Sequence, residues 1–101
     1  MLSTYIESFV KRLYPAYLNE YYIHIPKKKK HLFPEPPAKI VLEYDTQIFP
    51  AWVKSDSHGG SYIGRFPEWF KEHRRELEEA GKIIIHVDKQ NNRYRLEIPK
   101  K

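Results

Sequence analysis

The sequence predicts a mainly β domain of barrel type with two short helices. Segments of alternating apolar and polar residues recur along the chain, as at 39–44 and 93–98, and such alternation is typical of half-buried strands. Turn-forming residues separate these segments at short intervals, which favours a small barrel. Helical spacing of apolar residues is confined to about 3–13 and about 67–80.

The first predicted helix lies at about 3–13. Thr4 and Glu7 fit a capping box, apolar residues recur on one helical face, and Pro15 ends the pattern. We therefore expect residues 1–19 to form a helical extension that packs on the domain, with the barrel itself at 20–98.

The barrel strands are expected where alternation is clearest, at 20–25, 39–44, 48–54, 61–64, 83–87 and 93–98. Pro50 inside the third of these indicates an edge or a bulge, because proline has no amide hydrogen for a central strand. A tight turn at Asp45-Thr46-Gln47 and an asparagine-containing turn at 90–92 join two pairs of strands.

The second helix has clear signals at both ends. Pro67 suits the first helical position, and Gly81 suits the left-handed position that follows the last turn. Trp69, Phe70 and Leu77 fall on one face, which we assign to the core. Trp52 is assigned to the core as well, with a groove wall as the alternative.

Length, composition and net charge limit the classes of protein to which the chain can belong. The 101 residues are enough for a single domain, and 41% hydrophobic with 15% aromatic residues argues against disorder. No apolar run approaches the ~18 residues that cross a bilayer, so we expect no membrane partner. The absence of cysteine excludes disulfides and cysteine-bound zinc. The net charge of +5 favours polyanions, with nucleic acid first.

Most of the positive excess surrounds the segment 23–34, which reads Ile-His-Ile-Pro-Lys-Lys-Lys-Lys-His-Leu-Phe-Pro. Pro26 is expected to stop a strand, and Leu32 and Phe33 to enter the core. The four lysines would then form a positive segment fixed at both ends, as a polyanion-binding arm requires. The alternative is a solvated charge run.

Several motifs together resemble the B3 DNA-binding domain. Ile23-x-Ile25-Pro26-Lys27 followed by His31-x-Phe33-Pro34-x-Pro36 resembles its opening. Phe66-x-x-Trp69-Phe70-Lys71-Glu72 resembles its Trp-x-x-Phe-x-Lys-Glu pattern, with Phe70-Lys71-Glu72 aligned to the end. The resemblance covers about residues 20–98. The chain departs from the family by Gly81-Lys82 in place of Gly-Asp, by a glycine-rich second arm and by a denser lysine run.

The resemblance implies an open seven-stranded pseudobarrel that grips double-stranded DNA in the major groove with two arms, here 24–31 and 52–62. Such a domain acts as a regulator or as the recognition module of a restriction system. It implies a cytoplasmic, nucleoid-associated protein in a prokaryote and a nuclear one in a plant. A nuclease or other effector domain in a separate chain is a further partner that the resemblance leaves open.

The candidate DNA-binding residues follow from chemistry within these arms. Lysine ammonium groups contact phosphates without much selectivity, and four such contacts give a salt slope of about −3.6. Histidines add hydrogen bonds, and mixed donors and acceptors in the second arm suit base edges. An arginine after the fourth strand suits guanine or a phosphate, or else pairs with Glu68. The candidates are His24, Lys27, Lys28, Lys29, Lys30, His31, Lys54, Ser55, Asp56, Ser57, His58 and Arg65.

We expect a binding module without catalytic residues, metal or cofactor. The five histidines show no spacing typical of metal ligands, and no glycine-rich phosphate loop precedes a helix. Two alternatives stay open: a non-catalytic protein-interaction or structural pseudobarrel, and an RNA or single-strand binder. The latter needs outward aromatic side chains, for which Tyr21, Tyr22, Tyr44 and Tyr62 are the candidates.

Overall fold

One mixed sheet of seven strands forms the scaffold in residues 7–64 and 66–99, the parts of the chain that the computed structural model describes. The strands are β1 Glu7–Arg12, β2 Tyr22–Ile25, β3 Ala38–Tyr44, β4 Gln47–Ser55, β5 Ser61–Gly64, β6 Lys82–Asp88 and β7 Arg93–Glu97. The helices are α1 Pro15–Glu20 and α2 Pro67–Ala80, with short 3₁₀ helices η1 Lys27–Leu32 and η2 Lys89–Asn91. The predicted mainly β class is confirmed.

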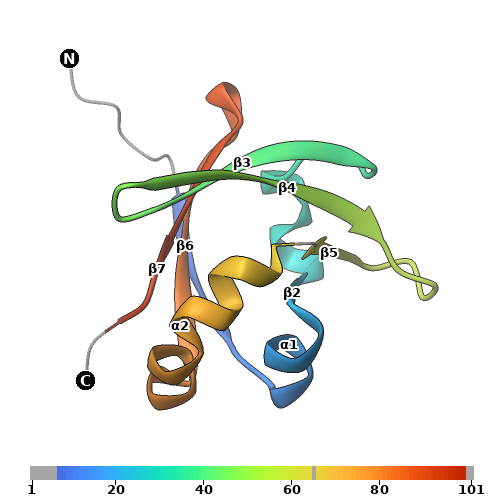
Figure 1. Ribbon diagram of the computed structural model, residues 1–101. Coiled ribbons are helices and arrows are strands. Elements are labelled where there is room, and N and C mark those ends of the chain that lie inside the picture. Colours follow the sequence, from blue (N-terminus) through green and yellow to red (C-terminus); the bar gives the residue numbers. More distant parts are fainter. Residues whose placement is uncertain (1–6, 65, 100–101) are drawn as a thin grey trace.

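The strands lie in the order β1-β6-β7-β3-β4-β5-β2. The β3–β7 pair is parallel, and the other neighbours are antiparallel. The sheet curls into a half-barrel whose two edges are β1 and β2 (Figure 1). The open seven-stranded pseudobarrel is therefore confirmed.

The core fills the concave side of the sheet, and α2 lies across the opening (Figure 1). Trp69, Phe70 and Leu77 of α2 are buried there, as expected. They meet inward side chains of the strands, among them Ile23, Ile40, Leu42, Ile63, Ile85, Tyr94 and Leu96. The alternation that predicted the strands is thus the alternation between core and solvent.

The predicted helix at about 3–13 is wrong for residues 7–12, which form β1. These residues pair with β6 over a six-residue ladder, from Glu7 opposite Val87 to Arg12 opposite Lys82. Phe9 is buried while Val10 is 60% exposed, which is the alternation of a strand. Pairing with a strand far away in sequence overrides the local helical pattern. The expected cap residue Thr4 lies outside the described residues.

Pro15, which was predicted to end a helix, instead begins one. Pro15 occupies the first turn of α1, a position where its missing amide hydrogen costs nothing. Tyr17 and Leu18 are buried, and Tyr21 ends the helix in the left-handed conformation with φ 63°. Residues 7–20 therefore form an edge strand and a short helix of the half-barrel.

The turn predictions are confirmed. Asp45 joins β3 to β4 with φ 55°, and Gly81 and Asn92 adopt φ 70° and 55° after α2 and η2. Pro50 lies in the part of β4 that pairs with β3 alone, since β5 pairs only with residues 52–55. Pro50 thus stands at a local edge of the sheet, as its missing amide hydrogen required.

Candidate nucleic-acid interface

The lysine segment is fixed at both ends, as predicted. β2 ends at Ile25, Pro26 follows, and residues 27–32 wind into η1. Leu32 and Phe33 are buried, and the Phe33 ring stacks on Tyr94 with centroids 4.9 Å apart. The Tyr94 hydroxyl donates to the Leu32 carbonyl at 3.1 Å. The ammonium groups therefore project from a segment that the core holds in place.

The four lysines of η1 have different surroundings. Lys27, Lys28 and Lys30 are exposed. Lys29 is half-buried: its Nζ lies 3.0 Å from Glu7 Oε2 on β1 and 5.7 Å from the Phe9 ring centroid. An ammonium already paired with a carboxylate has less to gain from a phosphate. Three lysines, not four, are therefore suited to contact nucleic acid.

The two histidines of the first arm differ in the same way. His24 is half-buried on β2, and its Nδ1 lies 3.5 Å from Lys11 Nζ on β1. Burial, and secondarily the Lys11 charge, lower the pKa of His24, so its ring favours the neutral form. His31 is exposed, and its carbonyl accepts a hydrogen bond of 2.7 Å from Lys89 Nζ.

The second arm is the loop between β4 and β5. Asp56 organises it: one carboxylate oxygen accepts from the backbone N–H groups of His58 and Gly60, each at 2.8 Å. These two hydrogen bonds lower the pKa of Asp56. One of the two carboxylate oxygens thus stabilises the loop itself. The exposed candidates are Ser55, Ser57 and His58, whereas Lys54 is half-buried, and Arg65 lies outside the described residues.

The structure brings the two arms together. β2 pairs with β5, which places His24 opposite Tyr62, and β5 pairs with β4, which places Tyr62 opposite Lys54. Lys30 Nζ donates to the Gly59 carbonyl at 3.4 Å. The 24–31 segment and the 52–62 segment therefore form one continuous surface.

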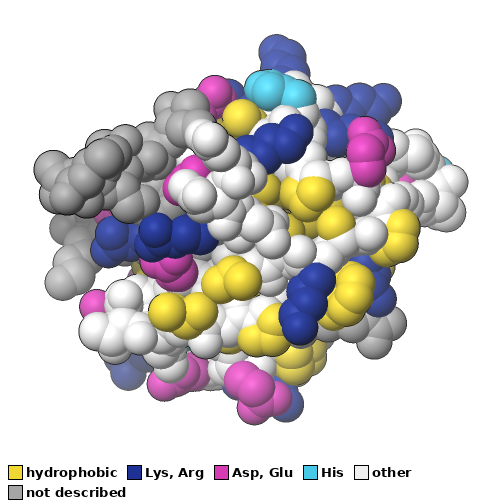
Figure 2. All heavy atoms as spheres, turned by 90° about the horizontal axis from the view of Figure 1, so that it is seen from above, with side chains coloured by type: hydrophobic (Ala, Val, Ile, Leu, Met, Phe, Trp, Pro, Cys, Tyr) yellow, Lys and Arg dark blue, Asp and Glu magenta, His cyan; other side chains and the backbone are white. Residues whose placement is uncertain are grey.

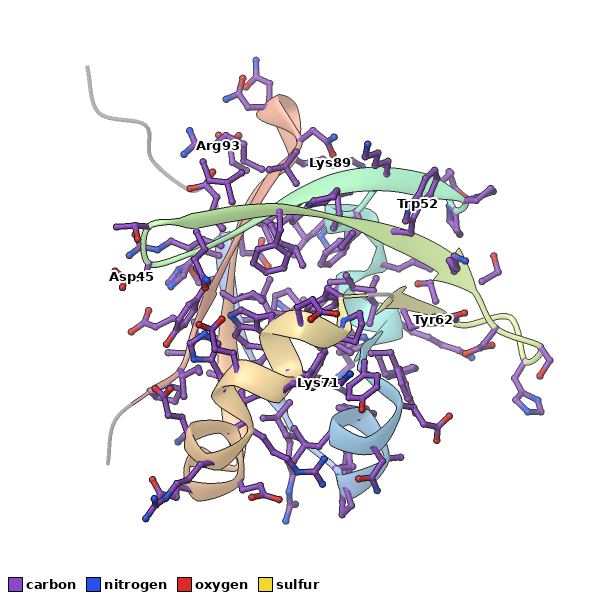
Figure 3. The ribbon with its side chains drawn as sticks, viewed as in Figure 1. Asp45, Trp52, Tyr62, Lys71, Lys89 and Arg93 are labelled. Carbon is purple, nitrogen blue, oxygen red and sulfur yellow. The ribbon has the colours of Figure 1, made fainter. Side chains whose placement is uncertain are left out.

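Trp52 faces solvent, so its assignment to the core is wrong. It is 41% exposed on the outer face of β4 at one end of the sheet, and Tyr62 lies near the same end (Figure 3). Ile48 and Pro50 are also exposed on this face of β4. Seen from above, hydrophobic side chains alternate there with Lys and Arg (Figure 2). Trp52 is therefore available at the surface, and the groove wall that was the alternative stays a prediction.

A cavity of about 770 Å³ opens between α1 and β2 on one side and β5 and the β4–β5 loop on the other. Its lining includes Tyr17, Glu20, Tyr22, His24, Asp56 and Tyr62. Among the described residues that line it, none is Lys or Arg. The basic residues lie at its border, so the concave surface between the arms is not uniformly positive.

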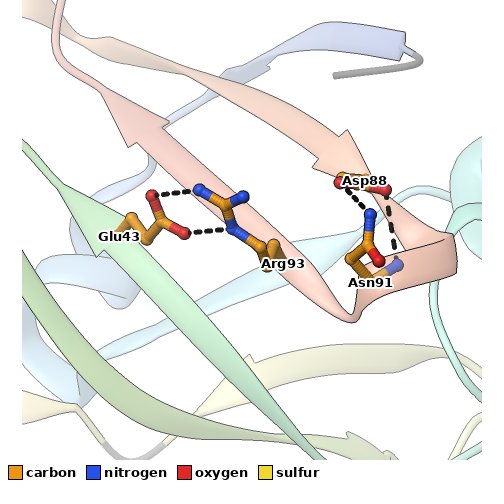
Figure 4. A network of polar contacts seen from close by, with 4 residues as sticks. All are labelled: Glu43, Asp88, Asn91 and Arg93. Atoms are coloured by element: carbon orange, nitrogen blue, oxygen red, sulfur yellow. Dashed lines mark hydrogen bonds and ion pairs between the residues drawn. The ribbon is translucent and has the colours of Figure 1, made fainter. Parts of the chain in front are cut away.

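Two basic residues near the β6–β7 turn already have partners, and Figure 4 shows one of them, Arg93, with Glu43. Arg93 donates to both carboxylate oxygens of Glu43, at 2.6 and 3.1 Å. Lys89 holds η1 through the His31 carbonyl. Asp88 is buried and accepts from the backbone and side chain of Asn91, at 3.4 and 2.8 Å. This region stabilises the fold and the base of η1.

Sequence reasoning missed one row of polar residues across β1, β6 and β7. Ser8 Oγ lies 2.6 Å from His86 Nδ1, and His86 Nε2 lies 2.7 Å from Glu97 Oε1. Ser8 and Glu97 are 89 positions apart in the chain, and the β1 register that joins them depends on a strand that looked helical. No local motif signals such a row.

Comparison of the chain with protein-family models, curated proteins and solved structures found no match. Within the described residues, no three His, Asp or Glu side chains gather where they would hold a metal ion. No helix in the same part of the chain is long and apolar enough to cross a membrane.

Proposed function

We propose that the chain binds double-stranded DNA through the two adjoining arms. The η1 lysines contact phosphates, and the β4–β5 loop offers donors and acceptors to base edges in the major groove. The observation that carries this proposal is the fixed η1 segment, with Lys27, Lys28 and Lys30 exposed. A cation on a fixed segment loses less conformational freedom on binding than one on a mobile tail.

The contact between the arms supports a joint action. Because Lys30 reaches the Gly59 carbonyl, phosphates held by η1 lie next to Ser57 and His58 of the loop. Phosphate contacts set the position of a protein on the duplex, and side chains beside them read the bases. The resemblance to B3 domains favours the same arrangement, with a role as a regulator or a restriction-system recognition module.

We infer binding without catalysis. The Ser8–His86–Glu97 row has hydrogen-bond distances suited to a nucleophile and a base, but Ser8 and Glu97 are exposed on the outer face of the sheet. Electrostatic stabilisation of a transition state needs a site from which water is excluded. The hydrogen bonds of this row serve to join three strands.

The salt dependence of binding tests the proposal. With three exposed lysines the η1 contribution to the salt slope is about −2.7, at ~0.9 per phosphate, not the −3.6 that four would give. Fluorescence anisotropy with a random-sequence 20-bp duplex between 50 and 200 mM salt measures it. Replacing Lys27 and Lys28 by Ala is expected to make the slope less steep by about 2 and to weaken binding to all sequences alike.

Two control variants sharpen this test. Lys82→Ala removes an exposed lysine at the start of β6 and is expected to change the slope by less than the η1 variants do. Lys29→Ala is expected to leave the slope nearly unchanged, because Lys29 is paired with Glu7. Absence of duplex binding at 50 mM salt would reject the proposal, and the lysine run would then be a solvated surface.

A second candidate function is binding of single strands or RNA. The observation that favours it is the outer face of β2, β5 and β4, where Tyr22, Tyr62 and Trp52 are partly exposed. Aromatic side chains of this kind stack unpaired bases. Single-stranded DNA and RNA of the same length, added as competitors, decide between the two functions.

A further inference from the structure

The cavity between the two arms has aromatic walls held at steep angles. The Tyr17 and Tyr22 ring centroids are 4.9 Å apart with planes at 58°, and those of Tyr22 and Tyr62 are 5.7 Å apart at 77°. Gly64 helps to set this arrangement, because a Cβ there would lie 2.9 Å from the Tyr62 ring. The half-buried rings of Tyr22 and Tyr62 thus offer apolar faces and edges to a flat guest, and the buried Tyr17 ring packs against Tyr22.

The cavity lining combines two carboxylates with tyrosine hydroxyls, which both donate and accept hydrogen bonds. Glu20 and Asp56 supply carboxylates, which in the ionised form accept hydrogen bonds and donate none. The backbone N–H groups on Asp56 hold the pKa of its carboxyl below the usual value, and one of its oxygens bears no hydrogen bond from the loop. His24, favouring its neutral form, has one donor and one acceptor nitrogen.

Positive charge is found at the border of the cavity. Lys11 Nζ lies 3.5 Å from His24 Nδ1 and 5.5 Å from the Tyr17 ring centroid. Lys54 stands opposite Tyr62 in the β4–β5 register, and η1 begins directly after the strand that carries Tyr22 and His24. A phosphate is therefore favoured beside these lysines and disfavoured next to the carboxylates of Glu20 and Asp56.

We propose that this cavity takes one unpaired nucleobase, while the phosphates on either side of it lie on the basic border. This inference rests on the proposed nucleic-acid binding and names the part of the nucleic acid that the cavity accepts. An unpaired base presents a flat face to the tyrosines and free amino groups to the carboxylates. A base within a duplex has both faces stacked and its pairing edge occupied.

The acceptors in the cavity also set a preference among bases. Cytosine carries an exocyclic amino group, which a carboxylate accepts well, whereas thymine presents carbonyl oxygens on both sides of its ring N–H. Carbonyl oxygens facing Glu20 or Asp56 repel them. Unpaired cytosine is therefore preferred over unpaired thymine at this site.

Four 20-mer probes test the proposal by fluorescence anisotropy at one salt concentration: a fully paired duplex, the same duplex with one bulged cytosine, the same with one bulged thymine, and the single strand. The expected result is binding of the cytosine bulge at least about 10-fold tighter than the paired duplex, which is the scale of one base stacked on an aromatic ring. The thymine bulge is expected to fall between them.

Tyr62→Ala is the variant that separates the cavity from the basic surface. It is expected to bring the ratio of the affinities for the bulged and the paired duplex to about 1, and this ratio is the readout because Tyr62 also belongs to the second arm. Tyr14→Ala serves as the matched control, because Tyr14 is 48% exposed and does not line the cavity. Circular dichroism and the urea midpoint of each variant establish that it is folded.

The possible outcomes separate the two proposals. Equal affinity for all three duplexes, unaltered by Tyr62→Ala, overturns the base-binding cavity and leaves duplex binding standing. Binding of the bulged duplex and the single strand without binding of the paired duplex supports the cavity and overturns the proposed duplex function. Absence of binding to any probe overturns both.

Discussion

At the scale of single residues, the hydroxyl of Tyr94 connects the core to the lysine segment. Tyr94 is fully buried, stacks on Phe33, and donates to the carbonyl at the end of η1. Tyr94→Phe keeps the ring but leaves the buried Leu32 carbonyl without this donor. We expect it to lower the free energy of unfolding by about 1–2 kcal/mol, measured by urea denaturation at pH 7.

The same residue makes stability sensitive to alkaline pH. Burial, and secondarily Asp88, raise the pKa of Tyr94 to about 12. Because this is above the value of about 10 for an unfolded chain, the contribution of the neutral phenol is complete below pH 10 and is lost as pH rises toward 12. Tyr94→Phe should therefore flatten the fall in stability over that range, and Tyr14→Phe, at an exposed position, should not. Equal curves for wild type and Tyr94→Phe would contradict this account.

The candidate residues could be predicted from sequence only as far as their chemistry is local. The identity of the lysine run and of the polar loop was visible in the chain. Other features depend on neighbours in three dimensions. Lys29 pairs with Glu7, and one carboxylate oxygen of Asp56 accepts hydrogen bonds from its own loop. Trp52 was misassigned because a strand in a half-barrel has an outer face that can carry a large aromatic side chain.

At the scale of elements, β1 shows where local pattern and tertiary pairing disagree. Phe9 and Val10 would both face the core in a helix, whereas in β1 only Phe9 is buried and touches Phe33 edge to face at 6.2 Å. Phe9→Ala is expected to cost about 3 kcal/mol of unfolding free energy, and Val10→Ala less than about 0.5. Urea denaturation of both variants measures the difference. Similar losses at the two positions would argue for the helix.

Other elements were predictable because their signals lie within a few residues. Pro67 and Gly81 mark the two ends of α2, and Asn92 takes the left-handed position before β7. These residues act through backbone conformation, which neighbours in sequence determine. The position of β1 follows instead from its ladder with β6, 70 to 80 residues away along the chain. One sequence without its fold carries no signal for that register.

At the scale of the whole molecule, the half-barrel is open between β1 and β2, and side chains link its two edges. Lys29 of η1 pairs with Glu7, and Lys11 of β1 lies beside His24 of β2. The η1 segment proposed to bind nucleic acid thus lies next to the seam of the barrel. Loss of β1 is therefore expected to affect both the stability of the barrel and the proposed interface.

Removing residues 1–19 tests whether β1 and α1 belong to one cooperative unit. The truncated chain loses the β1–β6 ladder and three buried side chains, Phe9, Tyr17 and Leu18. Their burial is worth roughly 5–9 kcal/mol, at ~1.5–3 for each, which is comparable with the 5–15 kcal/mol that stabilises an ordinary domain. We expect residues 20–101 alone to lack a cooperative urea transition, and a peptide of residues 1–19 to restore it in a concentration-dependent way. If the truncated chain unfolds at the same urea concentration as the whole one, the barrel is independent of its first strand, and residues 1–19 are the extension that the helical pattern had predicted.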